Sequence, residues 1–487
     1  MQLHNGNPRT PGEGAFTPLV ARFNMNQLIA TIVCVAVIFA LFAIDRDANV
    51  RTSKALWIPV VWLLINGSRP VSMWSQTDTV NLLASQYTEG SPLDATVYGI
   101  VIAAGMLALS SRSRKVKAFL QGNGPLVLFF SYCLLSIIWS DYPAIAFKRW
   151  IKAIGDVTMI MIVLTDQNPL AATRRFFSRA GFVLIPLSVL FIKYYPDLGR
   201  TYNQWTWLPM YTGVTTNKNS LGVICLVCGL GSLWSLIGAY EDRKMPRRTG
   251  HLIAHGILLA TAAWLIVKAN SMTSLSCLVM AGAVMVMSTQ RWVARLAGGV
   301  QAVVAGAVAL PFFAVFIDSA GELVQSLGRN ATLTGRTGIW KAALSLHTNP
   351  LLGTGFETFW LGDRLQQVWN MTEKGIQEAH NGYLEVYLNL GWIGVLLLGV
   401  LIVTGYRHAL AAFRYDPHAG RVRLAFFTAG VVYSLTEAGF RMMSPIWIAF
   451  LLATTYVPAS IRLKERQETP VLPLRQVALR RSIRILQ

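Results

Sequence analysis

The residues best suited to chemistry stand in the segment EAHNGYLEVYLNLGW, at positions 378–392. His380 lies between two carboxylates, Glu378 and Glu385, directly before a long apolar run. A neutral imidazole near pH 7 accepts a proton from a hydroxyl, and a nearby carboxylate fixes its tautomer and strengthens it as a base. Asn381 is suited to orienting a substrate amide or hydroxyl. The alternative is that His380 is an interfacial polar residue that caps a helix.

A second group of candidates consists of isolated cations beside the ends of apolar blocks, namely Arg200, Lys218, Lys268, Arg336 and Arg441. A guanidinium such as that of Arg336 binds phosphate bidentately. Lys218 is followed by Asn219, a further polar candidate. Each cation alone is explained by snorkelling to lipid headgroups. Five of them in segments otherwise poor in Lys and Arg favour a binding site for an anion.

The sequence contains no P-loop, no GxGxxG after a strand, no HExxH and no GxSxG. It also has no cluster of acidic residues of the kind that binds a metal and a nucleotide sugar. We therefore expect a reaction that uses an already activated, lipid-linked donor and needs neither a cofactor nor a metal.

Membrane helices must position these residues. The chain is 53% hydrophobic and only 14% charged, whereas about 25% of the residues of a soluble domain are charged. Many apolar blocks have the roughly 17–25 residues needed to cross a bilayer. We predict an all-α integral membrane protein of 12–13 transmembrane helices. The candidate spans are 28–44, 55–68, 95–110, 124–140, 150–165, 180–195, 219–238, 251–267, 271–289, 296–317, 382–405, 423–438 and 445–460.

Basic and non-basic loops alternate between these spans. The basic loops belong in the cytoplasm, and this also explains the net charge of +20 without nucleic-acid binding. The expected organisation has five parts: a polar N-terminal segment (1–27), spans 1–10 (28–317), a long outer loop (318–381), spans 11–13 (382–460) and a basic cytoplasmic tail (461–487).

The outer loop 318–381 is long enough to be functional. Two short helices are expected in it, at 334–350 and at 361–370. The first has an apolar stripe that includes Ile339 and Trp340, so it is suited to lying flat on the membrane surface.

Four ionisable residues, Lys152, Asp156, Lys193 and Glu437, fall within or next to predicted spans, and such residues are functional candidates. Lys152 and Asp156 are spaced i,i+4 and are expected to neutralise each other. This pairing would also suit a solute or bicarbonate-type transporter, which is one alternative function. A non-catalytic scaffold within an export complex is another.

The segments GRTGIWKAALSLHTNPLLGTGF (335–356) and AHNGYLEVYLNLGWIGVLLLGV (379–400) resemble the core of the O-antigen ligase and Wzy-type polymerase superfamily. TTNKNSLG (215–222) resembles that family's HKN-x-x-G stretch, although Asn217 stands where the family often has histidine. The resemblance is nearest to the exopolysaccharide polymerase branch, including GSRPVSMWSQ (67–76) and GSPLD (90–94).

The resemblance implies a GT-C-like multi-pass glycosyltransferase of the bacterial inner membrane with its active site at the periplasmic face. The implied substrate is an oligosaccharide linked to undecaprenyl diphosphate, and membrane lipids, a flippase and chain-length or export proteins are the implied partners. Polymerases transfer the growing chain to the next lipid-linked unit, whereas ligases transfer it to lipid A core. By the resemblance, His380 activates the acceptor hydroxyl, and Arg336 and Lys218 bind the diphosphate with support from Arg200 or Arg441. Glu385 or Glu378 would orient the imidazole.

Overall fold

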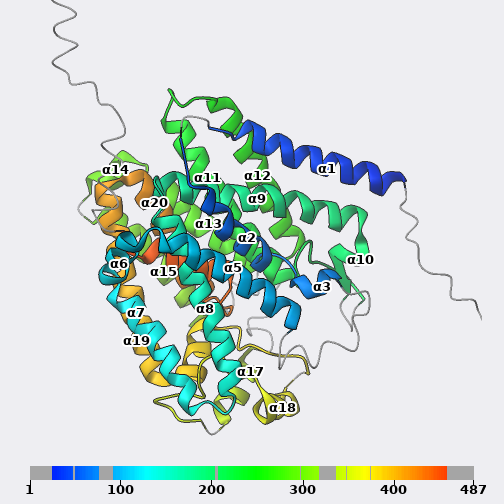
Figure 1. Ribbon diagram of the computed structural model, residues 1–487, viewed down its shortest axis with the longest axis vertical. Helices are drawn as coiled ribbons and strands as arrows, with labels where there is room; N and C mark the ends of the chain where they lie inside the picture. Colours follow the sequence, from blue (N-terminus) through cyan, green and yellow to red (C-terminus); the bar gives the residue numbers. More distant parts are fainter. Residues whose placement is uncertain are drawn as a thin grey trace, which may run out of the picture.

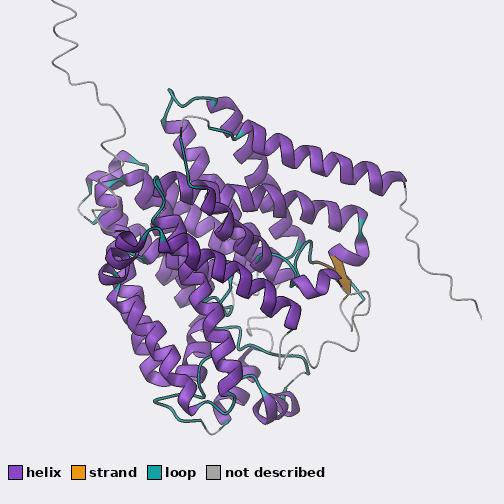
Figure 2. Cartoon of the chain, in the orientation of Figure 1, coloured by secondary structure: helices purple, strands orange, loops and turns teal. Residues whose placement is uncertain are grey.

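The structure is a computed structural model that describes residues 25–47, 50–75, 91–202, 207–296, 298–316, 336–346, 348–372 and 374–457. Helices make up most of it, as Figure 2 shows. The predicted N-terminal segment up to residue 24, the start of the outer loop (318–335) and the basic tail 461–487 lie outside the described residues.

Each predicted span overlaps a helix, although the bounds differ by several residues at some ends. The main helices are α1 (Met25–Ile44), α2 (Trp57–Asn66), α5 (Pro92–Ser110), α7 (Gly124–Leu135), α8 (Pro143–Leu164), α9 (Pro169–Tyr194), α11 (Lys218–Glu241), α12 (Arg248–Lys268), α13 (Met272–Met287), α15 (Gly299–Phe316), α19 (Gly382–Tyr415), α20 (Pro417–Tyr433) and α21 (Pro445–Thr454). Shorter elements connect them: η1 (Lys54–Leu56), α3 (Val71–Ser75), α6 (Ser113–Gly122), η2 (Ser136–Trp139), α10 (Pro196–Gly199), α14 (Arg291–Arg295), α17 (Arg336–Ser345) and α18 (Gly362–Met371). The strands β1 (Arg200–Tyr202) and β2 (Pro209–Tyr211) form an antiparallel hairpin in which Arg200 pairs with Tyr211.

Six helices of the described part, α1, α5, α9, α11, α12 and α19, are long and apolar enough to cross a membrane. The broken pair of Ser113–Gly122 and Gly124–Trp139, bent by 88°, would make a seventh. Several shorter apolar helices lie beside these, including α13 and α21. The chain is therefore an all-α integral membrane protein, and the count of 12–13 complete crossings stays a prediction.

Helix α11 forms the centre of the bundle, and most of its residues from Leu221 to Ser235 are buried. Helices α9, α12, α13 and α20 pack around it. Helix α1 lies at the edge of the bundle, beside α9 and α12 (Figure 1). Only Cys34 and Leu41 of α1 are buried.

A break inside α19 anchors the outer loop. Gly391 adopts φ 64° and ψ −166°, so the helical hydrogen bonds are interrupted there. The backbone N–H groups of Thr354 and Gly355 donate to the carbonyls of Leu388 and Asn389 at the break. In return, the N–H groups of Trp392 and Ile393 donate to the carbonyls of Pro350 and Leu351. The loop thus completes the backbone hydrogen bonding that the broken helix leaves open.

The predicted loop helices exist as α17 and α18, and together they cover a small apolar core. Ile339 and Ala343 of α17 are buried with Leu365 and Val368 of α18. The apolar face of α17 therefore packs against the rest of the loop, so it is not the free apolar stripe from which contact with the membrane surface is expected. The indole of Trp340 donates to the carbonyl of Ala379 at 2.8 Å, which ties α17 to the residue before His380.

The predicted span 423–438 is also corrected. Helix α20 ends at Tyr433, and residues 434–444 form a loop that leads to α21. This loop carries Glu437 and Arg441 out of the helices and toward α17 and α19.

Candidate functional site

A cavity of about 550 Å³ lies where the start of α11, the turn between α12 and α13, helix α17 and the segment before α19 meet. Its polar lining consists of Lys218, Asn219, Asn270, Ser271, Thr273, Arg336, Thr372, His380 and Glu437. Three of the cationic and titratable candidates, Lys218, Arg336 and His380, therefore face one space.

Glu437 is the centre of the polar contacts in this cavity. One carboxylate oxygen accepts from Arg336 Nη2 at 2.8 Å and from Asn219 Nδ2 at 3.2 Å. The other lies 3.1 Å from His380 Nδ1. Its side chain is only 6% exposed. One buried carboxylate thus joins α11, α17 and the segment before α19.

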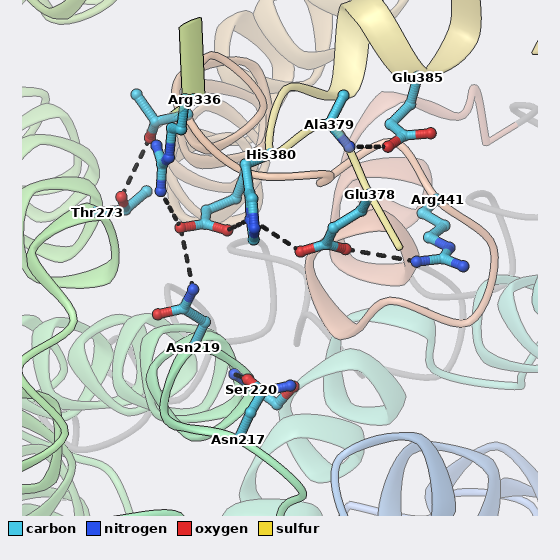
Figure 3. A network of polar contacts seen from close by, with 12 residues as sticks. Asn217, Asn219, Ser220, Thr273, Arg336, Glu378, Ala379, His380, Glu385 and Arg441 are labelled. Carbon is cyan, nitrogen blue, oxygen red and sulfur yellow. Dashed lines mark hydrogen bonds and ion pairs between the residues drawn. The ribbon is translucent and has the colours of Figure 1, made fainter. Parts of the chain in front are cut away.

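A second carboxylate contacts the same imidazole nitrogen. Glu378 Oε1 lies 3.0 Å from His380 Nδ1, and its other oxygen lies 3.4 Å from Arg441 Nη1. Arg441 Nε in turn lies 3.3 Å from Glu357 Oε2. The charges therefore alternate in sign from Arg336 through Glu437, His380 and Glu378 to Arg441. Figure 3 shows His380, Glu378 and Arg441 following one another in this series.

The backbone at the site is strained. His380 has φ 49°, a left-handed conformation that costs a residue with a side chain roughly 1–3 kcal/mol. Glu357 and Met443, near the far end of the charge series, have φ 56° and 63°. Such strain persists only where the surroundings fix the backbone. Here the N–H of Gly382 donates to the carbonyl of Ser434 at 2.8 Å, so the segment is tied directly to the loop that carries Glu437.

The two carboxylates determine the charge of the imidazole. Burial alone would lower the pKa of His380, but the hydrogen bonds and charges of Glu378 and Glu437 outweigh it and raise this pKa to about 10. Burial acts to raise the pKa of Glu378, yet the contact with His380 and the charges of Arg441 and Arg336 lower it. At neutral pH His380 is thus an imidazolium, whereas the sequence-based role as a base requires a neutral ring.

Carboxylates around a histidine also raise the question of a metal ion, because Glu378, His380 and Glu437 offer ligand atoms within 4.8 Å of one another. However, Arg336 and Arg441 each contact one of the two carboxylates. Two guanidinium groups beside the carboxylates already balance their charge, so the donor set fits a protonated imidazole better than a divalent cation.

Two of the predicted site residues have positions that differ from expectation. Glu385 does not contact His380; its carboxylate accepts from Trp360 Nε1 at 2.9 Å and from the N–H of Ala379. Asn381 caps α19, because its side-chain oxygen accepts from the N–H groups of Tyr383 and Leu384 at 3.0 Å each. Its amide nitrogen donates to the Leu435 carbonyl. Both residues thus hold the backbone on either side of His380, and the expectation that Glu385 orients the imidazole is wrong.

The cationic candidates divide between the cavity and its surroundings. Arg336 and Lys218 line the cavity, whereas Arg441 contacts Glu378 and Glu357 behind it. Arg200 is not among the lining residues; its Nε donates to the carbonyl of Ile192, and its guanidinium lies 5.7 Å from the ring of Tyr211. The predicted support from Arg200 is therefore not part of this cavity.

Asn217 has a structural role. It is the N-cap of α11, and its side-chain oxygen accepts from the N–H of Ser220 at 2.8 Å. Asparagine is among the best N-cap residues. The cap fixes the first turn of α11, which carries Lys218 and Asn219 into the cavity.

Sequence reasoning missed the partners of the imidazole and of Arg441. The sequence marks Glu437 as an ionisable residue at a predicted span without assigning it to the site, and it gives no indication of Glu357. The one available signal is that Glu437 precedes the candidate cation Arg441 by only four residues.

Asp156 also differs from expectation. Its carboxylate accepts from Trp62 Nε1 and from the N–H of Met443, each at 2.8 Å. Lys152 instead lies 5.4 Å from the ring of Tyr98. The predicted Lys152–Asp156 pair is therefore absent, and Asp156 anchors the loop that carries Arg441. The main observation in favour of a transporter is removed with that pair.

Two known protein groups are similar to this chain. Residues 256–399 match the model of a family described as O-Antigen ligase. The chain is also similar to the exopolysaccharide production protein ExoQ of Rhizobium meliloti (strain 1021), with 23% identity over 361 residues that cover 71% of this chain and 79% of the relative. The matched family segment includes Arg336 and His380. The resemblance to the O-antigen ligase and Wzy-type superfamily is confirmed by these two matches.

Proposed function

Since the chain is related to O-antigen ligase and Wzy-type proteins, we propose that it transfers a saccharide from an undecaprenyl-diphosphate-linked donor to a saccharide hydroxyl, and so extends an exopolysaccharide or O-antigen. The observation that carries the proposal is the convergence of Lys218, Arg336 and the protonated His380 on one cavity. Three positive groups in one space suit a diphosphate, which carries negative charge before the reaction and gains more as it leaves.

The proposed step forms one bond and breaks one. The acceptor hydroxyl oxygen bonds to the anomeric carbon of the donor, while the bond from that carbon to the diphosphate oxygen breaks. The electron pair of the broken bond leaves with the lipid diphosphate, and the hydroxyl proton passes to the carboxylate–imidazole cluster. Glu437 is the carboxylate of this cluster that lines the cavity. In-line displacement would invert the anomeric configuration.

Electrostatics supplies the main catalytic effect in this mechanism. Arg336 and the N–H of the His380 imidazolium would donate to the diphosphate oxygens as charge develops on them. Removing one preorganised donor of this kind typically costs about 10²–10³-fold in rate. The alternative mechanism keeps His380 as the base; it requires the ring to lose its proton before each transfer, although Glu378 and Glu437 hold that proton in place.

The name of the matched family model favours a second function, transfer of a finished polymer to lipid A core by a ligase. The name of the matched relative favours exopolysaccharide production. We prefer polymerisation because the ExoQ match covers most of both chains, whereas the family match covers only 256–399.

The test uses membranes or purified protein together with lipid-linked saccharides extracted from cells that lack this gene. A polymerase lengthens the saccharide on its lipid, and the products form a ladder of repeat units. A ligase instead moves saccharide onto an added lipid A core acceptor without lengthening it. Release of neither lipid diphosphate nor longer saccharide by the wild-type protein would refute both forms of the proposal.

A further inference from the structure

A second cavity lies between α1, α9 and α12, on the side of the bundle where α1 stands at the edge (Figure 1). It has a volume of about 580 Å³, and its lining is mostly apolar. Helix α1 contributes Ile29, Val33 and Val37, and α9 contributes Ile185, Val189 and Leu190, while α12 contributes Ile257, Leu258 and Thr261. We call it the α1 groove.

The α1 groove exists because α1 is attached to the bundle mainly at its two ends. At one end, Gln27 Nε2 donates to the carbonyl of Tyr194, and the hydroxyls of Thr31 and Tyr195 lie 2.8 Å apart. At the other end, Asp45 just beyond α1 accepts from two histidines of α12 at 2.7 and 3.0 Å. Between these attachments only Cys34 and Leu41 are buried, so an open apolar space remains between α1 and its neighbours.

The length of the α1 groove argues for a long hydrocarbon chain. Its lining on α1 extends from Asn26 to Leu41, which at 1.5 Å per residue corresponds to about 22 Å. One leaflet of the hydrocarbon core is only about 15 Å thick. The groove therefore extends past the midplane of the bilayer, where the acyl chains of phospholipids in their usual position end. A polyprenyl chain, which is several times longer, reaches along all of it.

Two lysines stand at the end of the groove nearest the candidate site. On α12, the lining residues Ile257 and Thr261 are followed on the same helix face by Trp264 and Lys268. On α9, Lys193 comes directly before the lining residue Tyr194. Both lysine Nζ atoms lie within 6 Å of the Trp264 ring, at 5.8 Å for Lys193 and 5.9 Å for Lys268. An apolar groove that ends between two exposed cations has the chemistry to bind a lipid with an anionic head.

The same end of the groove adjoins the candidate site along the chain. Lys268 is the last residue of α12, and Asn270, Ser271 and Met272 in the turn that follows line the cavity of Arg336 and His380. The head of a lipid lying in the α1 groove thus contacts the lysines beside that cavity, because Lys268 precedes the lining residue Asn270 by only two residues.

We propose that the α1 groove binds the hydrocarbon chain of a polyprenyl diphosphate, with Lys193 and Lys268 at the diphosphate end. This inference rests on the proposed function for the identity of the lipid, and it assigns the chain of that lipid to one place on the protein. The groove would hold the carrier lipid beside the cavity as saccharide is delivered and as the spent diphosphate leaves.

The test is binding of undecaprenyl diphosphate to the purified full-length protein, measured by native mass spectrometry with phosphatidylglycerol as competitor. Ala30→Trp fills the α1 groove, because Ala30 lines it. Ala36→Trp is the matched control, since Ala36 is exposed on the same helix and is not among the lining residues. The double variant Lys193→Gln with Lys268→Gln tests the diphosphate end.

We expect Ala30→Trp and the double lysine variant each to weaken binding of undecaprenyl diphosphate about ten-fold or more, and Ala36→Trp to bind as the wild type does. Phosphatidylglycerol should compete poorly. Equal binding by the wild type and Ala30→Trp would overturn the inference, as would equally effective competition by phosphatidylglycerol.

The binding test and the transfer test fail independently, because the probe carries no saccharide and its binding needs no reaction. The expected binding pattern in a protein that transfers nothing would support the groove and refute the proposed function. Transfer by the wild type together with equal binding by every variant would retain the proposed function and overturn the groove.

Discussion

Replacing Glu437 with glutamine removes one negative charge from the imidazole and leaves the shape of the side chain nearly unchanged. Glu437 and Glu378 lie 3.1 and 3.0 Å from His380 Nδ1. An opposite charge at such a distance shifts a pKa by about 1–3, so we expect His380 in the variant to titrate at roughly 7–9. In the wild type its pKa is about 10.

The size of the effect depends on pH. At pH 9 the wild-type ring is still about nine-tenths protonated, whereas a ring with a pKa of about 8 is only about one-tenth protonated. If the imidazolium is the active form, the ratio of wild-type to variant kcat/KM should be about ten-fold larger at pH 9 than at pH 6. Any constant loss caused by the weakened contacts to Arg336 and Asn219 cancels in this comparison.

The assay measures release of lipid diphosphate from extracted lipid-linked saccharides between pH 6 and 10. Glu385→Gln is the control, because Glu385 is a buried carboxylate in the first turn of α19 that contacts Trp360 and not the imidazole. Its profile should keep the wild-type shape, whatever its absolute rate. Identical profiles for wild type and Glu437→Gln would refute the reasoning. A wild-type rate that climbs steadily from pH 7 to 9, with the climb beginning earlier in Glu437→Gln, would make the neutral ring the active form and restore His380 as the base.

Three further predictions concern other residues. Arg336→Lys should lower the transfer rate by about 10²–10³-fold because the paired donors of the guanidinium are lost. The transfer rate of the control Arg200→Lys should stay within about two-fold of the wild-type rate, and similar losses in both variants would argue against a diphosphate site at Arg336. Asp156→Ala leaves the indole of Trp62 and the N–H of Met443 buried without their acceptor. Thermal unfolding in detergent should show that the free energy of unfolding falls by about 1–3 kcal/mol for each of these two groups, and an unchanged melting temperature would contradict the role of Asp156 as an anchor of the loop. Gly391→Ala would place a Cβ against the Leu351 carbonyl oxygen, whereas the Cβ of the control Gly399→Ala would meet nothing within 4 Å. Limited proteolysis should therefore cleave the outer loop faster in Gly391→Ala than in Gly399→Ala, and equal cleavage of the two variants would count against the docked loop.

The helices were predictable because their signals are local. Apolar length identified the membrane helices, and the pattern of Ile339 and Ala343 identified α17 within two residues of its start. The shared cavity of Lys218, Arg336 and His380 was predictable in part, since each stands at the end of a helix and the loop charges put those ends on one side of the membrane.

The partners of these residues were not predictable, because their contacts join segments far apart in the chain. Glu437 lies in an apolar stretch that hydropathy extends into a span, although the helix ends at Tyr433. The i,i+4 spacing predicts a pair between Asp156 and Lys152, whereas the buried carboxylate of Asp156 accepts from Trp62 and Met443 instead. A buried carboxylate takes whichever donors the tertiary fold brings to it, and sequence spacing does not contain that information.

The break at Gly391 has a consequence for attempts to change which saccharide is handled. Thr354 and Gly355 supply the donors that the helix lacks there, and Trp392 and Ile393 use loop carbonyls in return. A chimera that receives another protein's outer loop but keeps its own α19 would have to match these four backbone contacts by chance. The segment to exchange therefore extends past the break to Ile393. The outer loop and the part of α19 up to Ile393 are then taken together from the same protein.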